Sequence, residues 1–189
     1  VFDVGFLSQI PNMTVLSPVD YREFGSMLEF AVSFNGPIAI RYPRGAMNEE
    51  INKSNQKIIL GKGTIAKEGE DITIAAAGKM VKTALDVCEI LKRENISGEV
   101  LNLRFIKPFD KDLILKSLNK TKKLVVIDEA PLYGSFALNI IPYLPKETDL
   151  LIKTLPDKFI KQGSIDDLLK ENKLDADSIA KDIIKWRLK

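Results

Sequence analysis

The 189-residue sequence contains no histidine and a single cysteine, Cys88. Without histidine, the chain cannot form a Ser-His-Asp or Cys-His catalytic site, or a histidine-rich zinc site. A single cysteine cannot form an internal disulfide, which fits a reducing cytoplasm. Any acid–base chemistry within the chain would therefore depend on carboxylates, lysine or tyrosine.

Long apolar runs and an excess of one charge are also missing. No apolar stretch approaches the roughly 20 residues that a membrane-spanning helix needs. The 28 basic and 26 acidic side chains give a formal net charge of +2 and are spread along the chain, so no clustered basic face indicates nucleic-acid binding. The first residues include neither an initiator Met nor the basic segment of a signal peptide, and we therefore expect a piece of a longer protein.

Residues 1–45 predict a strand, a helix and a second strand. The apolar run at 13–16 is typical of a strand, and Ser17 is a favourable N-cap for the helix that follows. Apolar residues recur at helical spacing to about Phe34, and Ile38–Ile40 then has the composition of a buried strand. A lone βαβ unit would leave its strand edges open, so we expect it to be the end of a larger domain.

The polar segment 46–56 predicts an interdomain linker. Residues 57–189 then alternate strand and helix patterns, which predicts a second domain with a largely parallel α/β sheet flanked by helices. We expect strands at 63–66, 72–77, 100–105, 123–127 and 150–154, and helices at 81–91, 110–118, 135–144, 164–169 and 177–188.

The loop Arg41-Tyr42-Pro43-Arg44-Gly45 is the strongest candidate for a binding site. It follows an expected strand, and ligands bind outside the carboxyl ends of strands in open α/β sheets. Guanidinium groups bind phosphate through paired hydrogen bonds, so Arg41 and Arg44 predict a phosphate site. The alternative from these residues alone is a surface loop with two solvated arginines.

Other singled-out residues have both functional and structural interpretations. Asp128-Glu129 ends an expected strand, where carboxylates could act as acids or ligands, or could cap a helix or contact another subunit. Cys88 lies on the apolar face of its expected helix, which predicts a buried cysteine and not a nucleophile. Phe159 predicts an anchoring aromatic beyond a strand, and Trp186 predicts a packing residue.

Short motifs along the whole chain occur in an order and at separations that a known enzyme family shares. They are Ile10-Pro11-Asn12-Met13-Thr14-Val15, Ser17-Pro18 with Asp20, Gly36-Pro37, Arg41-Tyr42-Pro43-Arg44-Gly45, Gly61-Lys62-Gly63, Gly78, Arg104-Phe105-Ile106-Lys107-Pro108 with Asp110, Asp128-Glu129, Leu155-Pro156-Asp157 with Phe159 and Gly163, and Leu174-Asp175. With them the chain resembles the C-terminal part of the 1-deoxy-D-xylulose-5-phosphate synthases. Arg-Tyr-Pro-Arg-Gly together with Leu-Pro-Asp-x-Phe is the most specific feature of this resemblance.

The resemblance implies that residues 1–45 end a pyrimidine-binding domain and that 57–189 form a transketolase C-terminal domain. The family condenses pyruvate with D-glyceraldehyde 3-phosphate, giving 1-deoxy-D-xylulose 5-phosphate and CO2 for isoprenoid, thiamine and pyridoxal synthesis. Its members are homodimers that use thiamine diphosphate and Mg2+. Carried over to this sequence, Arg44 is the expected ligand of the substrate phosphate, and Arg41 is either a second ligand or a residue that holds the loop.

The catalytic histidine of the family, its cofactor-activating glutamate and its diphosphate–Mg2+ site match no position in this sequence. The resemblance therefore implies a cofactor bound mainly by residues absent from this chain, with no catalytic, cofactor-binding or metal-ligating residue assigned here. We expect the isolated chain to be inactive, with the missing N-terminal part and a second copy as partners in the cytoplasm. Two alternatives stay open: a subunit of another transketolase-like enzyme, and a non-catalytic dimerisation or ligand-binding module.

Overall fold

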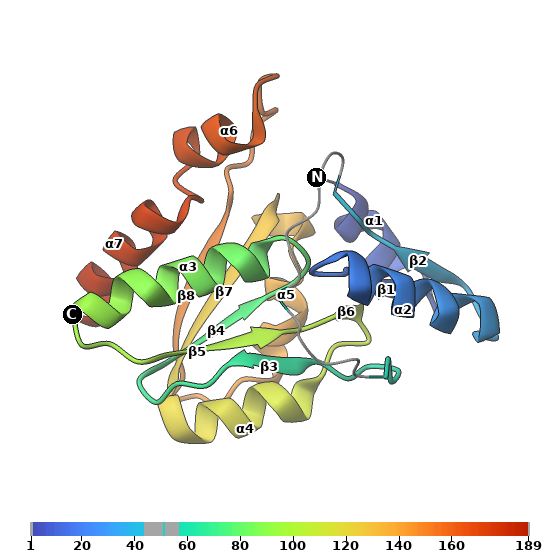
Figure 1. The fold of residues 1–189 in the computed structure, drawn as a ribbon, viewed down its shortest axis with the longest axis horizontal. Coiled ribbons are helices and arrows are strands. Elements are labelled where there is room, and N and C mark those ends of the chain that lie inside the picture. The colour runs from blue at the N-terminus through green and yellow to red at the C-terminus, as the bar shows by residue number, and fades with distance from the viewer. Residues whose placement is uncertain (1, 44–50, 52–56, 189) are drawn as a thin grey trace.

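A computed structural model describes residues 2–43, 51 and 57–188 and contains two sheets with surrounding helices (Figure 1). The strands are β1 (Thr14–Leu16), β2 (Ile38–Ile40), β3 (Thr64–Lys67), β4 (Ile72–Ala76), β5 (Gly98–Asn102), β6 (Phe105–Lys107), β7 (Lys123–Pro131) and β8 (Asp149–Leu155). The α-helices are α1 (Asp3–Gln9), α2 (Tyr21–Ser33), α3 (Met80–Arg93), α4 (Lys111–Thr121), α5 (Ala137–Ile140), α6 (Ile165–Glu171) and α7 (Ala176–Arg187). Two 3-10 turns, η1 (Leu132–Gly134) and η2 (Ile141–Tyr143), flank α5.

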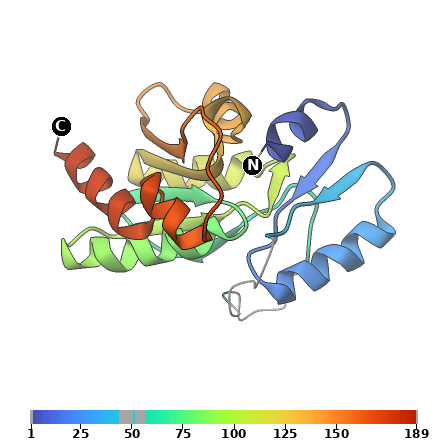
Figure 2. The same ribbon diagram turned by 90° about the horizontal axis from the view of Figure 1, so that it is seen from above.

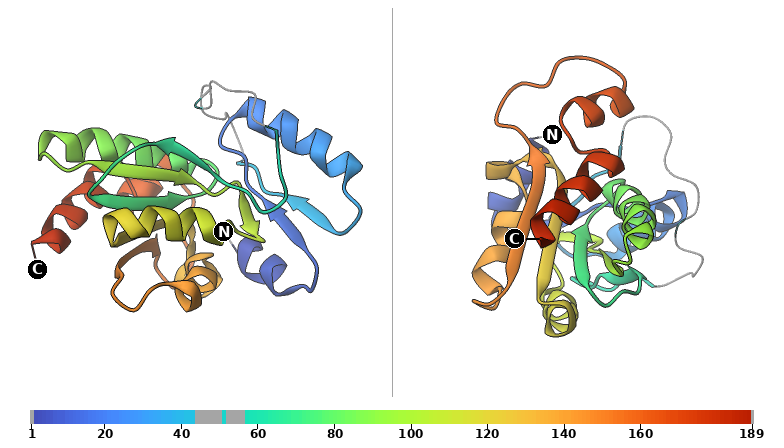
Figure 3. Two further views of the ribbon diagram at one scale, coloured as in Figure 1. Left: turned by 90° about the horizontal axis from the view of Figure 1, so that it is seen from below. Right: turned by 90° about the vertical axis from the view of Figure 1, so that its left-hand side faces the viewer.

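The large sheet has the strand order β3-β5-β4-β7-β8 and is parallel except for the antiparallel edge strand β3. Alternate residues of β4 face opposite sides, as strand geometry requires. Ile72 and Ile74 pack with α3 and α7, whereas Ala75 packs with α4 and α5 on the other face (Figure 3). The expected α/β class with a largely parallel sheet flanked by helices is confirmed.

The small sheet has the order β2-β1-β6 and lies beside one end of the large sheet (Figure 2). The expected βαβ unit supplies β1, α2 and β2, with β1 and β2 parallel. The third strand, β6, comes from the later part of the chain and pairs antiparallel with β1. The edge of β1 that the sequence left open is therefore covered.

The expected single strand at 100–105 is wrong, because the chain divides there into β5 and β6 in different sheets. Arg104 adopts the left-handed conformation, with φ at +55°. An extended strand cannot continue through that conformation, so the chain turns from the large sheet into the small one.

The helix α2 begins after Asp20 and not after Ser17. The Asp20 carboxylate accepts a hydrogen bond from the Glu23 N–H at 2.8 Å, which makes it the N-cap. Ser17 lies buried at the end of β1. The expected linker at 46–56 lies outside the described residues except for Ile51, so its extent and the domain boundaries stay predictions.

The expected helix at 135–144 is reduced to the four residues of α5 between two 3-10 turns. Pro142 has no N–H to donate, so α-helical hydrogen bonding cannot continue through it. The short helix α1, which precedes β1, was not expected from the sequence. None of the helices in the described part of the chain is long and apolar enough to cross a membrane.

Cys88 and Trp186 have the structural roles that their positions predict. Cys88 is buried against the large sheet, and its thiol donates to the Gly98 carbonyl oxygen at 3.5 Å. Burial raises the pKa of this thiol to about 12, which disfavours the nucleophilic thiolate. Trp186, near the end of α7, is partly buried against the core that α3 and α7 cover.

A buried carboxylate on β5 lies beneath α4. The Glu99 side chain is 1% exposed and accepts hydrogen bonds from the Lys120 amine at 2.7 Å and from the Ser117 hydroxyl. Burial alone would raise the pKa of Glu99, but the hydrogen bonds from Lys120 and Ser117 outweigh burial and lower its pKa. Such a carboxylate contributes stability above its unfolded-state pKa and loses that contribution as the pH falls through its folded pKa.

We therefore predict that Glu99→Gln lowers the free energy of unfolding by about 1–3 kcal/mol at pH 7, the cost of losing charge-assisted hydrogen bonds. The difference from the unmodified chain shrinks as the pH falls below the ordinary pKa of a glutamate, because the pKa of Glu99 is lowered in the folded state and protonation of the unfolded state then removes the contribution. Equilibrium urea unfolding of both chains between pH 7 and 3 measures this difference in the free energy of unfolding. Glu89→Gln is the control, because exposed Glu89 pairs with Lys67 at 3.5 Å and we expect a change of about 0.5 kcal/mol or less. If Glu99→Gln lowered the free energy of unfolding by the same amount at every pH, the prediction would be contradicted.

Candidate functional site

The expected site loop lies where the two sheets meet. The residues 41–43 follow β2 directly, as predicted. Two other segments reach the same place: the start of α3, beyond the carboxyl end of β4, and the last residues of β7. This edge of a parallel sheet is where ligands bind in open α/β folds.

Arg41 is tied to both parts of the molecule by ion pairs. Its Nε lies 2.6 Å from Asp3 Oδ2 on α1, and its Nη2 lies 3.0 Å from Glu129 Oε1 on β7. Lys79 Nζ, at the start of α3, contacts Glu129 Oε2 at 2.6 Å. Burial would lower the pKa of Arg41, but the charges of Glu129 and Asp3 outweigh it and raise its pKa further. The guanidinium is therefore permanently charged and fixed in place.

Asp3 is the less buried partner of Arg41. Burial would raise the pKa of the Asp3 carboxyl, but the nearby Arg41 charge outweighs this effect and lowers its pKa. Both partners are thus charged at neutral pH. The ion pair joins α1 to the loop that follows β2.

The two acidic residues of β7 have different surroundings, and the strand continues past both of them to Pro131. Asp128 is buried and accepts hydrogen bonds from the Ser135 hydroxyl at 2.8 Å and the Phe136 N–H at 3.1 Å. It therefore organises the turn that leads into α5, whose N-cap is Phe136 without a side-chain cap hydrogen bond, so Asp128 does not cap that helix. Burial raises the pKa of Asp128. Glu129 instead links Arg41 and Lys79.

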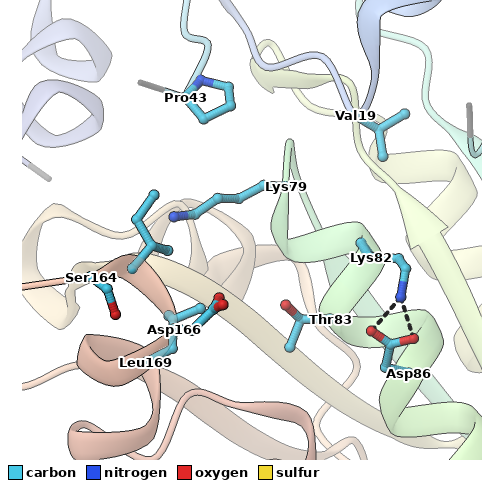
Figure 4. Close-up of a pocket in the computed structure, with 10 residues that line it drawn as sticks. Val19, Pro43, Lys79, Lys82, Thr83, Asp86, Ser164, Asp166 and Leu169 are labelled. Carbon is cyan, nitrogen blue, oxygen red and sulfur yellow. Dashed lines mark hydrogen bonds and ion pairs between the residues drawn. The ribbon is translucent and has the colours of Figure 1, made fainter. Parts of the chain in front are cut away.

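Two cavities of about 430 Å³ each adjoin the loop. Arg41, Tyr42 and Glu129 line the first, and Pro43 and Lys79 line both. Figure 4 shows the Lys79 amine between Pro43 and the start of α6. Arg41 and Lys79 line this space together with the carboxylates that pair with them, Asp3 and Glu129, so the described lining is charged but has no excess of cations.

The predicted site residues differ in how far the structure describes them. Arg44 lies outside the described residues, so its assignment as a phosphate ligand stays a prediction. Arg41 is described, and its contacts with two carboxylates favour the alternative in which it holds the loop. Its direct contact with a phosphate also stays a prediction. In the described residues, no group of three or more acidic or cysteine side chains could hold a metal ion.

Sequence reasoning missed two charged residues of this site. Asp3 lies on a helix that the sequence did not predict. Lys79 had one indirect signal, the preceding Gly78 at the end of a strand pattern. Gly78 has φ at +56°, and a Cβ there would lie 2.4 Å from Ser17 Oγ. The glycine permits the close approach of β1 to the start of α3 that brings Lys79 to the loop.

The expected anchoring aromatic, Phe159, is not buried. Its side chain is 89% exposed, and its ring contacts the half-exposed ring of Phe2 edge-on, with centroids 6.1 Å apart. The anchor prediction is therefore wrong for the described chain, because the segment after β8 leaves the core before Phe159. Both rings lie on the surface near α1.

Comparison with known proteins places these features in a family. The model of the family "Transketolase, C-terminal domain" matches residues 61–179. The 1-deoxy-D-xylulose-5-phosphate synthases of Caldanaerobacter subterraneus subsp. tengcongensis and Clostridium perfringens are 38% and 40% identical to the chain over 187 and 189 residues. Each match covers 97% of this chain and 30% of the relative, so the chain spans about 30% of the length of these curated relatives.

A solved structure is similar over the same extent. It is titled "Split gene transketolase, inactive beta4 tetramer", with a TM-score of 0.90 and 26% identity, and the match covers 97% of this chain and 60% of that one. The resemblance drawn from the motifs is thus confirmed. The family match covers all five strands of the large sheet and most of its helices. The chain belongs to the transketolase C-terminal domain family.

Proposed function

We propose that the chain is the C-terminal part of a 1-deoxy-D-xylulose-5-phosphate synthase. The complete enzyme would condense pyruvate with D-glyceraldehyde 3-phosphate, releasing CO2. The observation that carries this proposal is the identity of 38–40% to synthases of that name across 97% of the chain. The product would supply isoprenoid, thiamine and pyridoxal synthesis in the cytoplasm. The partners would be the rest of the enzyme and a second copy, with residues 1–45, 46–56 and 57–189 as domain end, linker and C-terminal domain.

Within this reaction we assign phosphate binding to Arg44 and loop positioning to Arg41. The Arg41 fork is occupied by Asp3 and Glu129, so its charge holds the loop between α1 and β7. A phosphate contact made by the next arginine of the loop would orient the aldehyde of the acceptor toward the reacting carbon, and such orientation lowers the barrier. The acceptor would then be recognised by its phosphate end.

Thiamine diphosphate would supply the decarboxylation chemistry in the complete enzyme. The described residues do not fit its Mg2+–diphosphate group, because they contain no cluster of acidic side chains that could hold a metal ion. We therefore assign its ligands to the rest of the enzyme.

The test is CO2 release by the full-length enzyme from pyruvate with thiamine diphosphate and Mg2+, measured with and without D-glyceraldehyde 3-phosphate. We expect release that depends on the triose phosphate, together with formation of 1-deoxy-D-xylulose 5-phosphate. No turnover with these substrates would contradict the proposed function.

A second candidate is a subunit of a transketolase encoded in separate parts. The observation that favours it is the split-gene transketolase, which is similar over 97% of this chain. The candidates differ in their chemistry, because a transketolase would transfer a two-carbon ketol group between sugar phosphates. Ketol transfer without CO2 release from pyruvate would select this second candidate.

A further inference from the structure

The segment that connects β5 to β6 fastens the two sheets together. The chain leaves the large sheet at Asn102, turns at Arg104 and pairs with β1 in the small sheet. Phe105 is fully buried in the core of the small sheet. The Lys107 amine donates to two carbonyl oxygens at the end of α1, at 2.7 and 2.9 Å. The Arg-Phe-Ile-Lys-Pro motif therefore joins elements that lie far apart in the sequence.

Arg104 forms the most buried ion pair of this junction. Its Nε lies 2.6 Å from Glu23 Oε1 on α2, and the two side chains are 4% and 2% exposed. The Asn102 amide donates to both oxygens of Glu23, at 3.1 and 3.2 Å, and the Val19 N–H donates at 2.8 Å. The Asn102 side chain also accepts from the Arg104 N–H at 3.1 Å. These contacts hold Arg104 in its left-handed conformation, which costs a non-glycine residue energy.

The backbone of Arg104 leads from this ion pair to the site loop. Its carbonyl oxygen accepts from the Ser17 N–H at 2.8 Å. The Ser17 hydroxyl in turn donates to the carbonyl oxygen of Arg41 at 3.3 Å, and the Arg41 N–H donates to the Leu16 carbonyl oxygen at 2.8 Å. The loop that carries Arg41 and precedes Arg44 is thus attached to Arg104 through a single intermediate residue.

We propose that Arg104, held by Glu23, is a positioning residue for residues 41–43, the described part of the site loop. It touches no substrate in this role and acts through Ser17 on the loop backbone. The inference rests on the proposed function, because it presumes that the loop binds the phosphate of the acceptor. A planar guanidinium and a lysine amine differ in geometry, so Arg104→Lys keeps the charge but changes the position of the backbone.

The experiment compares acceptors in the full-length enzyme carrying Arg104→Lys. We expect the KM for D-glyceraldehyde 3-phosphate to rise about tenfold, since small displacements of binding groups have effects of this order or larger. We expect the KM for pyruvate, and the kcat/KM for D-glyceraldehyde without phosphate, to change less than about twofold. Equal changes for the phosphorylated and unphosphorylated acceptors would overturn the inference.

A double variant separates this inference from the proposed function. If Arg104 acts through Arg44, Arg104→Lys changes the KM for the triose phosphate less than about twofold in an Arg44→Ala background. If the double variant instead raised this KM by the product of the two single-variant effects, the positioning role would be overturned, while the phosphate site would stand. If Arg44→Ala alone leaves that KM unchanged, the phosphate site itself is wrong and the inference fails with it.

The matched control is Glu99→Gln, which neutralises another buried carboxylate, the one that pairs with the partly exposed Lys120 of α4. We expect it to lower stability without changing the KM for the triose phosphate. Where Arg104→Lys does not fold, Ser17→Ala is the substitute, because it removes only the hydroxyl contact with the Arg41 carbonyl. We expect a rise of about threefold in the same KM. An unchanged KM in Ser17→Ala would overturn the inference.

Discussion

Replacing Arg44 with alanine in the full-length enzyme should raise the KM for D-glyceraldehyde 3-phosphate by about 10- to 150-fold. A charge-assisted hydrogen bond to phosphate contributes about 1.5–3 kcal/mol, and each 1.4 kcal/mol corresponds to about tenfold. Pyruvate carries no phosphate, so its KM should change less than about twofold. Steady-state kinetics with each substrate varied in turn measures both values.

Lys82→Ala is the matched control for this variant. Lys82 lines the cavity beside Pro43 and is paired with Asp86, so its removal takes away a nearby positive charge without touching the loop. We expect the acceptor KM to change less than about twofold, because exposed paired charges contribute little. If Lys82→Ala raised the acceptor KM as much as Arg44→Ala does, the effect would be a general electrostatic one. If Arg44→Ala raised the KM for pyruvate as much as the KM for D-glyceraldehyde 3-phosphate, the assignment of Arg44 to phosphate binding would be contradicted.

The sequence predicts best those elements whose residues face a single environment. Ile72–Ala76 and residues 123–127 are short apolar runs, and both form buried central strands of the large sheet. The helix α3 follows the expected apolar spacing, and Cys88 lies on its buried face as predicted. In these segments, local composition and tertiary packing favour the same structure.

The junction between the sheets could not be predicted from local patterns. Residues 100–105 are apolar enough for one strand, but the left-handed turn at Arg104 depends on contacts with Glu23 and Asn102. Glu23 lies 81 positions earlier in the chain. No periodicity relates two residues at that separation, so this turn is set by tertiary structure.

The candidate site shows the same division. The Arg41 loop could be located from the strand before it and from its two arginines. The residues that pair with Arg41 could not be located in this way, because Asp3 lies on a helix that the sequence did not predict and Glu129 lies near the end of β7, in the other sheet. Asp128 and Glu129 are adjacent in sequence, yet one is buried in a turn and the other forms ion pairs. Their separate roles follow from strand geometry, which directs neighbouring side chains to opposite faces.

Arg104→Met should lower the free energy of unfolding of the 189-residue chain by about 3–5 kcal/mol, the range for breaking a buried ion pair. Methionine can fill the space of the arginine stem, but the Glu23 carboxylate would lose its 2.6 Å contact and remain buried. Equilibrium urea unfolding at pH 7 measures this loss.

Combining Arg104→Met with Glu23→Gln tests the physical cause of that loss. A neutral glutamine carries no buried charge, and its single amide oxygen, placed where Glu23 Oε2 lies, can still accept hydrogen bonds from the Asn102 amide and the Val19 N–H. We therefore expect the double variant to lose less than the sum of the single losses, by at least about 1 kcal/mol. Strictly additive losses would show that Arg104 stabilises the junction through packing and not through its charge.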